Sequence, residues 1–139
     1  MPAGEIALDR LDHLVLTVKD MEATCHFYAR VMGMRRENFG EGRVALHFGR
    51  QKINLHPYPS PIEPKAATAR PGTADLCFIT QTPLAAVMDH LEGCGVEIEL
   101  GPVPTTGAEG PMRSVYFRDP DANLIEIANY DPASAAPSA

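Results

Sequence analysis

The sequence repeats its own pattern along the chain, and this repeat limits the possible folds more than any other feature. His13 and Gly33 are 20 positions apart, and so are Asp75 and Gly95, which places both pairs at the same offset of 62. In each half a short apolar run precedes a helical segment that ends at the glycine. Such self-similarity predicts two copies of one supersecondary unit that bury their apolar faces together.

The first half is predicted to be a βαβββ module over residues 9–57. Its strand at 11–18 is followed by Asp20, a good helix N-cap, and the helix that follows is expected to end at Gly33. Three further strand-like runs are separated by turn residues and cover 34–39, 43–49 and 52–58. The first copy of the unit is therefore complete before the middle of the chain.

A proline-rich segment divides the chain. Residues 57–72 contain five prolines, too many for a helix or an inner strand, so residues 58–72 are predicted to be a linker. Residues 9–131 are then expected to form one domain, with module one at 9–57 and module two at 73–131. Residues 132–139 have little apolar bulk and are predicted to be a flexible tail.

Module two repeats the order of elements of module one. A strand is predicted at 74–80, and Thr82 and Pro83 are expected to be the N-cap and first residue of a helix that ends at Gly95. The remaining strands are predicted at 96–100, 114–119 and 123–130. The segment 101–111 is expected to be a loop that is longer than its counterpart in module one.

The composition favours a small-molecule ligand. Acidic residues outnumber basic ones 18 to 12 and the net charge is -6, which disfavours a nucleic-acid partner. No apolar stretch approaches the length of a membrane span, and the first residues have no signal-peptide core, so no membrane partner is expected. The 3 cysteines show no metal or disulfide spacing and predict reduced thiols in a cytoplasmic protein.

Several polar residues are predicted to share the sheet face that points away from the helices. Side chains alternate along a strand, so His13 points away from the helix that covers Leu14 and Leu16. By the repeat, Asp75 occupies the matching position in module two. The same alternation in the last strand of each module places the following residues on this face: Asn54, His56 and Glu126.

This combination of side chains points to a metal site. A buried carboxylate such as Glu126 is costly unless a cation compensates its charge, and a divalent cation with histidine and carboxylate ligands does so. Imidazole and carboxylate together suit Zn, Ni, Fe or Mn without choosing among them. A lone histidine on a strand is more often an ordinary core or surface residue, so the prediction depends on the whole set and its repeat-related positions.

The sequence resembles the vicinal oxygen chelate superfamily, which holds glyoxalase I, bleomycin- and fosfomycin-resistance proteins and extradiol dioxygenases. The resemblance covers about residues 11–130 and is carried by four segments, namely "LDHLVLTVKDMEATCHFYARVMGM", "INLH", "PGTADLCFIT" and "FRDPDANLIEIANY". Within the superfamily, "QKINLH", "EPKAA" and "YFRDPDANLIE" are similar to the group of glyoxalase domain-containing protein 5. The resemblance implies an α+β fold whose paired βαβββ modules form an open, eight-stranded, barrel-like sheet.

The resemblance also implies a set of metal ligands from the first and last strands of each module. His13 matches the first-strand ligand of module one, Asp75 that of module two, and Glu126 the last-strand glutamate of module two. Many relatives have histidine where this chain has Asp75. The fourth ligand falls on Asn54 by the repeat, with His56 two residues further on the same face. We take His56 as the ligand and keep Asn54 as the alternative.

The activity that the resemblance implies is metal-dependent and glyoxalase-like. A lyase or isomerase would act on a small substrate that is chelated through vicinal oxygens, with Glu126 as the general base, or Asp75 if that residue is not a ligand. Two alternatives are a ring-cleaving dioxygenase and a non-catalytic protein that sequesters a drug, as bleomycin-resistance proteins do. The resemblance also implies a homodimer, in which the modules pair within one chain or are exchanged between two.

Overall fold

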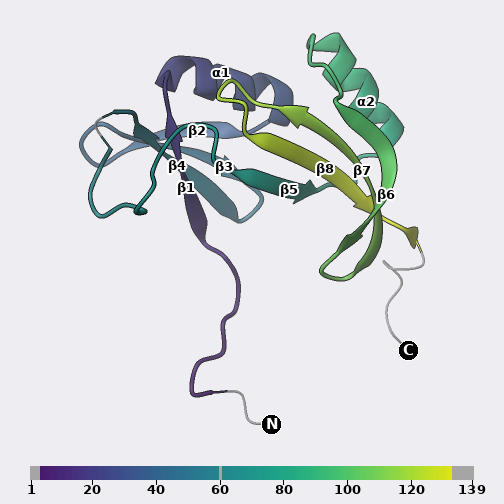
Figure 1. The fold of residues 1–139 in the computed structure, drawn as a ribbon, viewed down its shortest axis with the longest axis horizontal. Helices are drawn as coiled ribbons and strands as arrows, with labels where there is room; N and C mark the ends of the chain where they lie inside the picture. The colour runs from purple at the N-terminus through teal and green to yellow at the C-terminus, as the bar shows by residue number, and fades with distance from the viewer. Residues whose placement is uncertain (1–3, 60, 133–139) are drawn as a thin grey trace.

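The computed structural model describes residues 4–59 and 61–132 and shows two four-stranded mixed sheets, each with one helix (Figure 1). The predicted α+β class with paired βαβββ modules is confirmed, and the sheets are open rather than closed into a barrel. Within the described ranges, no helix has the length and apolar character that a membrane span requires. The tail predicted at 132–139 lies outside the described residues, apart from Pro132.

Module one forms a sheet in which its first and last strands are neighbours. The order of strands is β1-β4-β3-β2, and β1 runs parallel to β4. Asp20 accepts a hydrogen bond from the Ala23 N–H at 3.0 Å at the start of the helix, and Gly33, with a φ of 68°, ends it, both as predicted. The elements are β1 (His13–Val18), α1 (Met21–Met32), β2 (Arg35–Phe39), β3 (Arg43–Phe48) and β4 (Gln51–Pro57).

Module two repeats this topology. Its strand order is β5-β8-β7-β6, and β5 runs parallel to β8 as β1 does to β4. Each module therefore places the first strand of the unit directly beside the last one. The elements are β5 (Asp75–Ile79), α2 (Leu84–Gly93), β6 (Leu100–Gly107), β7 (Gly110–Arg118) and β8 (Leu124–Tyr130).

One predicted strand of module two is displaced. Residues 96–99 are not in a strand, although Val96 and Ile98 pack against the core, and β6 instead occupies most of the segment predicted as a loop. The prediction of a loop at 101–111 was wrong, although this segment contains Pro102 and Pro104. They are tolerated because β6 is an edge strand, where one side of the backbone has no pairing partner.

The start of α2 also differs from the prediction. Its N-cap is Pro83 rather than Thr82, and the cap makes no side-chain hydrogen bond. The N–H of Leu84 donates instead to Asn129 Oδ1 of β8 at 2.8 Å, while Asn129 Nδ2 donates to the carbonyls of Thr80 and Thr82. A residue 45 positions away thus supplies the cap, which local sequence patterns do not reveal.

The two modules are joined through the faces that carry the helices. Both helices lie on the upper side of the molecule in Figure 1, with the strands below them. Tyr28 of α1 donates its hydroxyl to Asp119 Oδ2 of module two at 2.6 Å, and the ring of Phe27 lies 6.4 Å from that of Phe117. The shared core includes Leu16, Ile53, Leu55, Leu91, Ile125 and Ile127. The opposite face of each sheet is therefore left for the polar residues.

Candidate functional site

Two cavities lie beside the sheets: module one, the linker and three residues of module two (Thr73, Ala74 and Asn123) line the first, and module two alone lines the second. Cavity one, of about 440 Å³, lies between β1 and the linker and has His56 in its lining. Cavity two, of about 340 Å³, lies between β5, β8 and the β6–β7 hairpin and has Glu126 in its lining. Among the described residues, none lines both cavities.

Glu126 is held in cavity two by its own strand and by a pair of hydroxyls. Ile125 and Ile127 are buried in the core, so strand alternation turns Glu126 to the other face, where it is only 9% exposed. Ser114 Oγ donates to Glu126 Oε2 at 2.5 Å, and Thr105 Oγ1 lies 2.6 Å from Ser114 Oγ. Because the Ser114 proton is directed at the carboxylate, Thr105 must be the donor to Ser114. The thiol of Cys77 and the phenol of Tyr116 are also hydrogen-bond neighbours of this carboxylate.

The carboxylate of Glu126 also sets the electrostatics of cavity two. Cys77 of β5 and Tyr116 of β7 are the register partners of Glu126 on the two adjoining strands. Burial, together with the Glu126 charge, raises the pKa of the Cys77 thiol to about 11 and raises the pKa of the Tyr116 phenol. Both neighbours are therefore neutral at pH 7, and Glu126 forms no ion pair with any described residue.

His56 is the corresponding polar residue of cavity one. It lies on β4 and is 4% exposed, and neither ring nitrogen has a hydrogen-bond partner among the described residues. Burial, and secondarily the positive charge of Arg43, lowers the pKa of the imidazole. The ring is thus neutral near pH 7 and carries one free lone pair, the form in which histidine binds metals. Asn54 is also buried with its Oδ1 unpartnered, but it does not line cavity one.

The two first-strand candidates lie outside both cavities. His13 is at the start of β1, where its Nδ1 lies 2.8 Å from Asp12 Oδ2 and its side chain is 42% exposed. Asp75 is exposed at the start of β5. Each therefore occupies the first position of its strand, as the repeat predicted. Both side chains are exposed to solvent and can contact other groups.

A single chain does not gather the predicted ligands into one site. In the part of the chain that the structure describes, no group of three or more histidine, cysteine, aspartate or glutamate side chains is placed to hold a metal ion. His56 and Glu126 line separate cavities. Each module thus carries part of the predicted ligand set, with one buried member in each cavity.

The donor chemistry of both halves nevertheless fits a divalent cation. A buried imidazole with a free lone pair is a good ligand, and a buried carboxylate without a cationic partner is stabilised by one. The sequence did not single out Ser114, Thr105 or Cys77 as neighbours of Glu126. The pairing of β8 with β5 and β7 places Cys77 beside Glu126, but strand pairing cannot be read from one sequence.

Known proteins resemble the chain over nearly all of its length. A virulence protein of Salmonella typhimurium, STM3117, is 51% identical over 91% of this chain and 88% of its own length. The glyoxalase domain-containing protein RDO1 of Mycosarcoma maydis is 48% identical over 93% of this chain and 73% of its own length. The solved structure of a Vibrio cholerae integron cassette protein has a TM-score of 0.89 and 55% identity, covering 91% of this chain and 98% of that one.

More distant structures share the fold with lower identity. They include a lactoylglutathione lyase from Agrobacterium tumefaciens (TM-score 0.68, 22% identity) and an antibiotic-binding protein from Streptomyces (TM-score 0.73, 21% identity). The fold therefore occurs both in enzymes and in binding proteins. The family model for the Glyoxalase/Bleomycin resistance protein/Dioxygenase superfamily matches residues 10–127, and the chain belongs to this superfamily.

Proposed function

We propose that this chain is a metal-dependent enzyme of the glyoxalase type whose site is completed by a second copy of the chain. The observation that carries the proposal is the state of Glu126, a buried carboxylate with no cationic partner among the described residues. A carboxylate in this state is strongly stabilised by an external cation. The buried and unpartnered ring of His56 supports the same conclusion for the other module.

The proposed ligands are His13, His56, Asp75 and Glu126, and the metal is Zn, Ni, Fe or Mn. His13 and His56 come from module one, whereas Asp75 and Glu126 come from module two. When bound, such an ion supplies Lewis acidity to adjacent oxygens of a substrate. Because His56 and Glu126 line different cavities of one chain, we propose that module one of one copy faces module two of the other.

Exposed apolar side chains support a homodimer of this kind. Val15 of β1 and Ile79 of β5 lie on the open faces and are 44% and 46% exposed. Ile6 and Leu8, in the N-terminal arm that extends away from the body in Figure 1, are 76% and 91% exposed. A twofold dimer that covers these side chains would also create two equivalent sites.

Glu126 is the proposed general base of the reaction. Its side chain lines cavity two, where the carboxylate would remove a proton from the carbon next to a substrate carbonyl and return it to a neighbouring position. Ser114 donates to Oε2 and is itself supported by Thr105, so the carboxylate keeps its orientation while the proton moves. The neutral Tyr116 adjoins the carboxylate on β7 and adds a hydroxyl group to the cavity wall.

The first test is the metal content of the full chain purified without added metal. We expect about one divalent ion per chain, and loss of this ion with a chelator should abolish turnover of a hemithioacetal in the absence of O₂. The absence of an ion, together with no affinity for Zn, Ni, Fe or Mn on titration, would contradict the proposal.

The competing functions predict different results. A drug-sequestering protein of this fold would bind its ligand equally well without metal. A ring-cleaving dioxygenase would consume O₂ with a catechol after anaerobic loading with iron. Only 6% of residues are aromatic and there are 0 tryptophans, which disfavours capture of a flat drug by stacking.

A further inference from the structure

Cavity one has a cationic rim, although the chain as a whole is acidic. The linker forms one wall of the cavity, β1 and β4 form another, and Thr73, Ala74 and Asn123 of module two complete the lining. The charged residues of its lining are Lys65 and Arg70, and no carboxylate is among the described lining residues. The chain has a net charge of -6, so the sign of the charge at this cavity is opposite to that of the chain as a whole.

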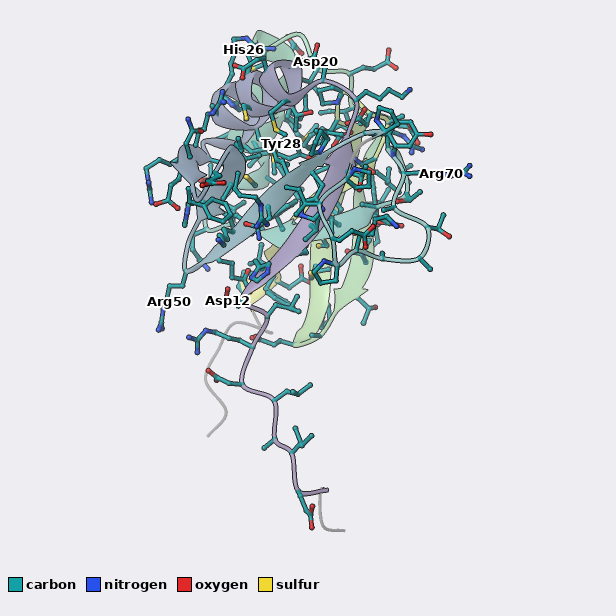
Figure 2. The ribbon with its side chains drawn as sticks, turned by 90° about the vertical axis from the view of Figure 1, so that its left-hand side faces the viewer. Asp12, Asp20, His26, Tyr28, Arg50 and Arg70 are labelled. Carbon is teal, nitrogen blue, oxygen red and sulfur yellow. The ribbon has the colours of Figure 1, made fainter. Side chains whose placement is uncertain are left out.

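Only one of the two cations is paired with a described carboxylate. The side chain of Arg70 extends from the linker into solvent in Figure 2 and forms no ion pair with a described residue. Lys65 lies 3.2 Å from Glu63, whose side chain is 72% exposed. A solvent-exposed pair of this kind contributes little, so a buried or bidentate anion would compete with it successfully.

The linker holds these residues over the cavity. Thr73 Oγ1 donates to the carbonyl of Arg70 at 3.0 Å, and the Ala74 N–H donates to Asn123 Oδ1 at 2.9 Å. Proline residues at 61, 64 and 71 further restrict the backbone on both sides of the cations. The linker backbone is therefore held in place, while the long side chains of Lys65 and Arg70 can change their rotamers.

The base of the cavity also requires a polar ligand. His56 is 4% exposed and both ring nitrogens lack a partner among the described residues, which is an unfavourable state for a buried polar group. At about 440 Å³, the cavity has the size of a site for a small organic molecule. It thus combines a buried polar base with a cationic rim.

We propose that cavity one is the anion subsite of the substrate, and that Lys65 and Arg70 bind a carboxylate group of a small organic acid. The proposal rests on the proposed function, because the acid would extend from this rim toward the metal ligands. A carboxylate suits the rim better than a phosphate does, since the described lining contains no helix N-terminus or glycine-rich loop of the kind that cradles phosphates. The substrate class is therefore a small carboxylic acid with vicinal oxygens.

Titration of the full-length, chelator-treated chain with succinate tests this subsite without any metal. We expect saturable binding, followed by calorimetry and by NMR shifts of the His56 ring, and weaker binding at high salt. Lys65→Ala combined with Arg70→Ala should weaken succinate binding about tenfold or more. Arg50→Ala is the matched control, because Arg50 lies on the opposite side of the molecule in Figure 2, and it should leave binding unchanged.

The results separate this proposal from the proposed function. Equal binding of succinamide, binding of inorganic phosphate alone, or an unchanged affinity in the double variant would overturn the carboxylate subsite. Glu126→Gln should retain succinate binding even though it loses metal. Metal binding without succinate binding would refute the subsite alone, whereas succinate binding without any metal affinity would refute the metal enzyme.

Discussion

At the scale of single residues, Glu126 depends on the hydroxyls that hold it. Ser114 donates to one carboxylate oxygen at 2.5 Å and Thr105 in turn supports Ser114. Hydrogen bonds of this kind orient metal ligands and increase their affinity.

Glu126→Gln is expected to abolish metal binding, because the amide cannot replace the charge of the carboxylate. Ser114→Ala keeps the carboxylate but removes the hydrogen bond that orients it. This change should weaken metal affinity by about 10- to 100-fold. Asp89→Asn, which changes an exposed carboxylate on α2, is the control and should have no effect. Titration with a metal-sensitive dye measures all three. Wild-type affinity in Glu126→Gln would remove this residue from the ligand set.

The buried hydrogen bond between Tyr28 and Asp119 is one of the contacts that join the two modules. Asp119 also accepts from the backbone N–H groups of Asp121 and Asn123 and from Asn123 Nδ2, so it organises the turn before β8. Tyr28→Phe removes only the hydroxyl donor at 2.6 Å and should lower the free energy of unfolding by about 1.5–3 kcal/mol. Tyr58→Phe changes a half-exposed ring and should be neutral. Equal urea midpoints for the two variants would show that this contact does not stabilise the fold.

At the scale of elements, the β6–β7 hairpin positions the residues that support Glu126. β7 carries Ser114, and β6 carries Thr105 and approaches β7 closely at Gly101. A Cβ atom at Gly101 would lie 2.5 Å from the carbonyl oxygen of Ser114 and 2.9 Å from the Val115 Cα. The φ of Gly101, 120°, is also unfavourable for any other residue.

Gly101→Ala should therefore destabilise the chain by about 1–3 kcal/mol or more, because backbone atoms must move apart. Gly42→Ala is the control for the backbone angle alone. Its φ is 71° and a Cβ atom there meets nothing within 4 Å, so it should cost about 1 kcal/mol. Chemical denaturation compares the two variants. A Gly101→Ala variant no less stable than Gly42→Ala would mean that β6 and β7 are not packed as described.

The sequence predicted the repeated module but not every element within it. Local signals at Asp20 and Gly33 placed α1 correctly, because the cap residues are adjacent to the helix they cap. The cap of α2 comes from Asn129, which only the fold brings near. Strand alternation placed Glu126 and His56 on the right faces, whereas β6 was missed because the tolerance of proline depends on its edge position.

At the scale of the whole molecule, the two cavities have opposite electrostatic character. The rim of cavity one carries Lys65 and Arg70, whereas Glu126 is the charged residue in the described lining of cavity two. If cavity one of one copy faces cavity two of another, His56 of one copy and Glu126 of the other would line one shared site. Because one chain carries both cavities, a twofold dimer would form two equivalent shared sites.

Hybrid dimers test this account most directly. His13→Ala inactivates module one and Glu126→Gln inactivates module two, so neither variant alone should hold metal. When the two are co-expressed with different tags and the mixed dimer is isolated, one of its two sites would contain only wild-type ligands. A site shared between two copies predicts about half of the wild-type metal content per chain in this mixed dimer. No metal in the mixed dimer, while the wild-type chain holds its ion, would contradict a site shared between two copies.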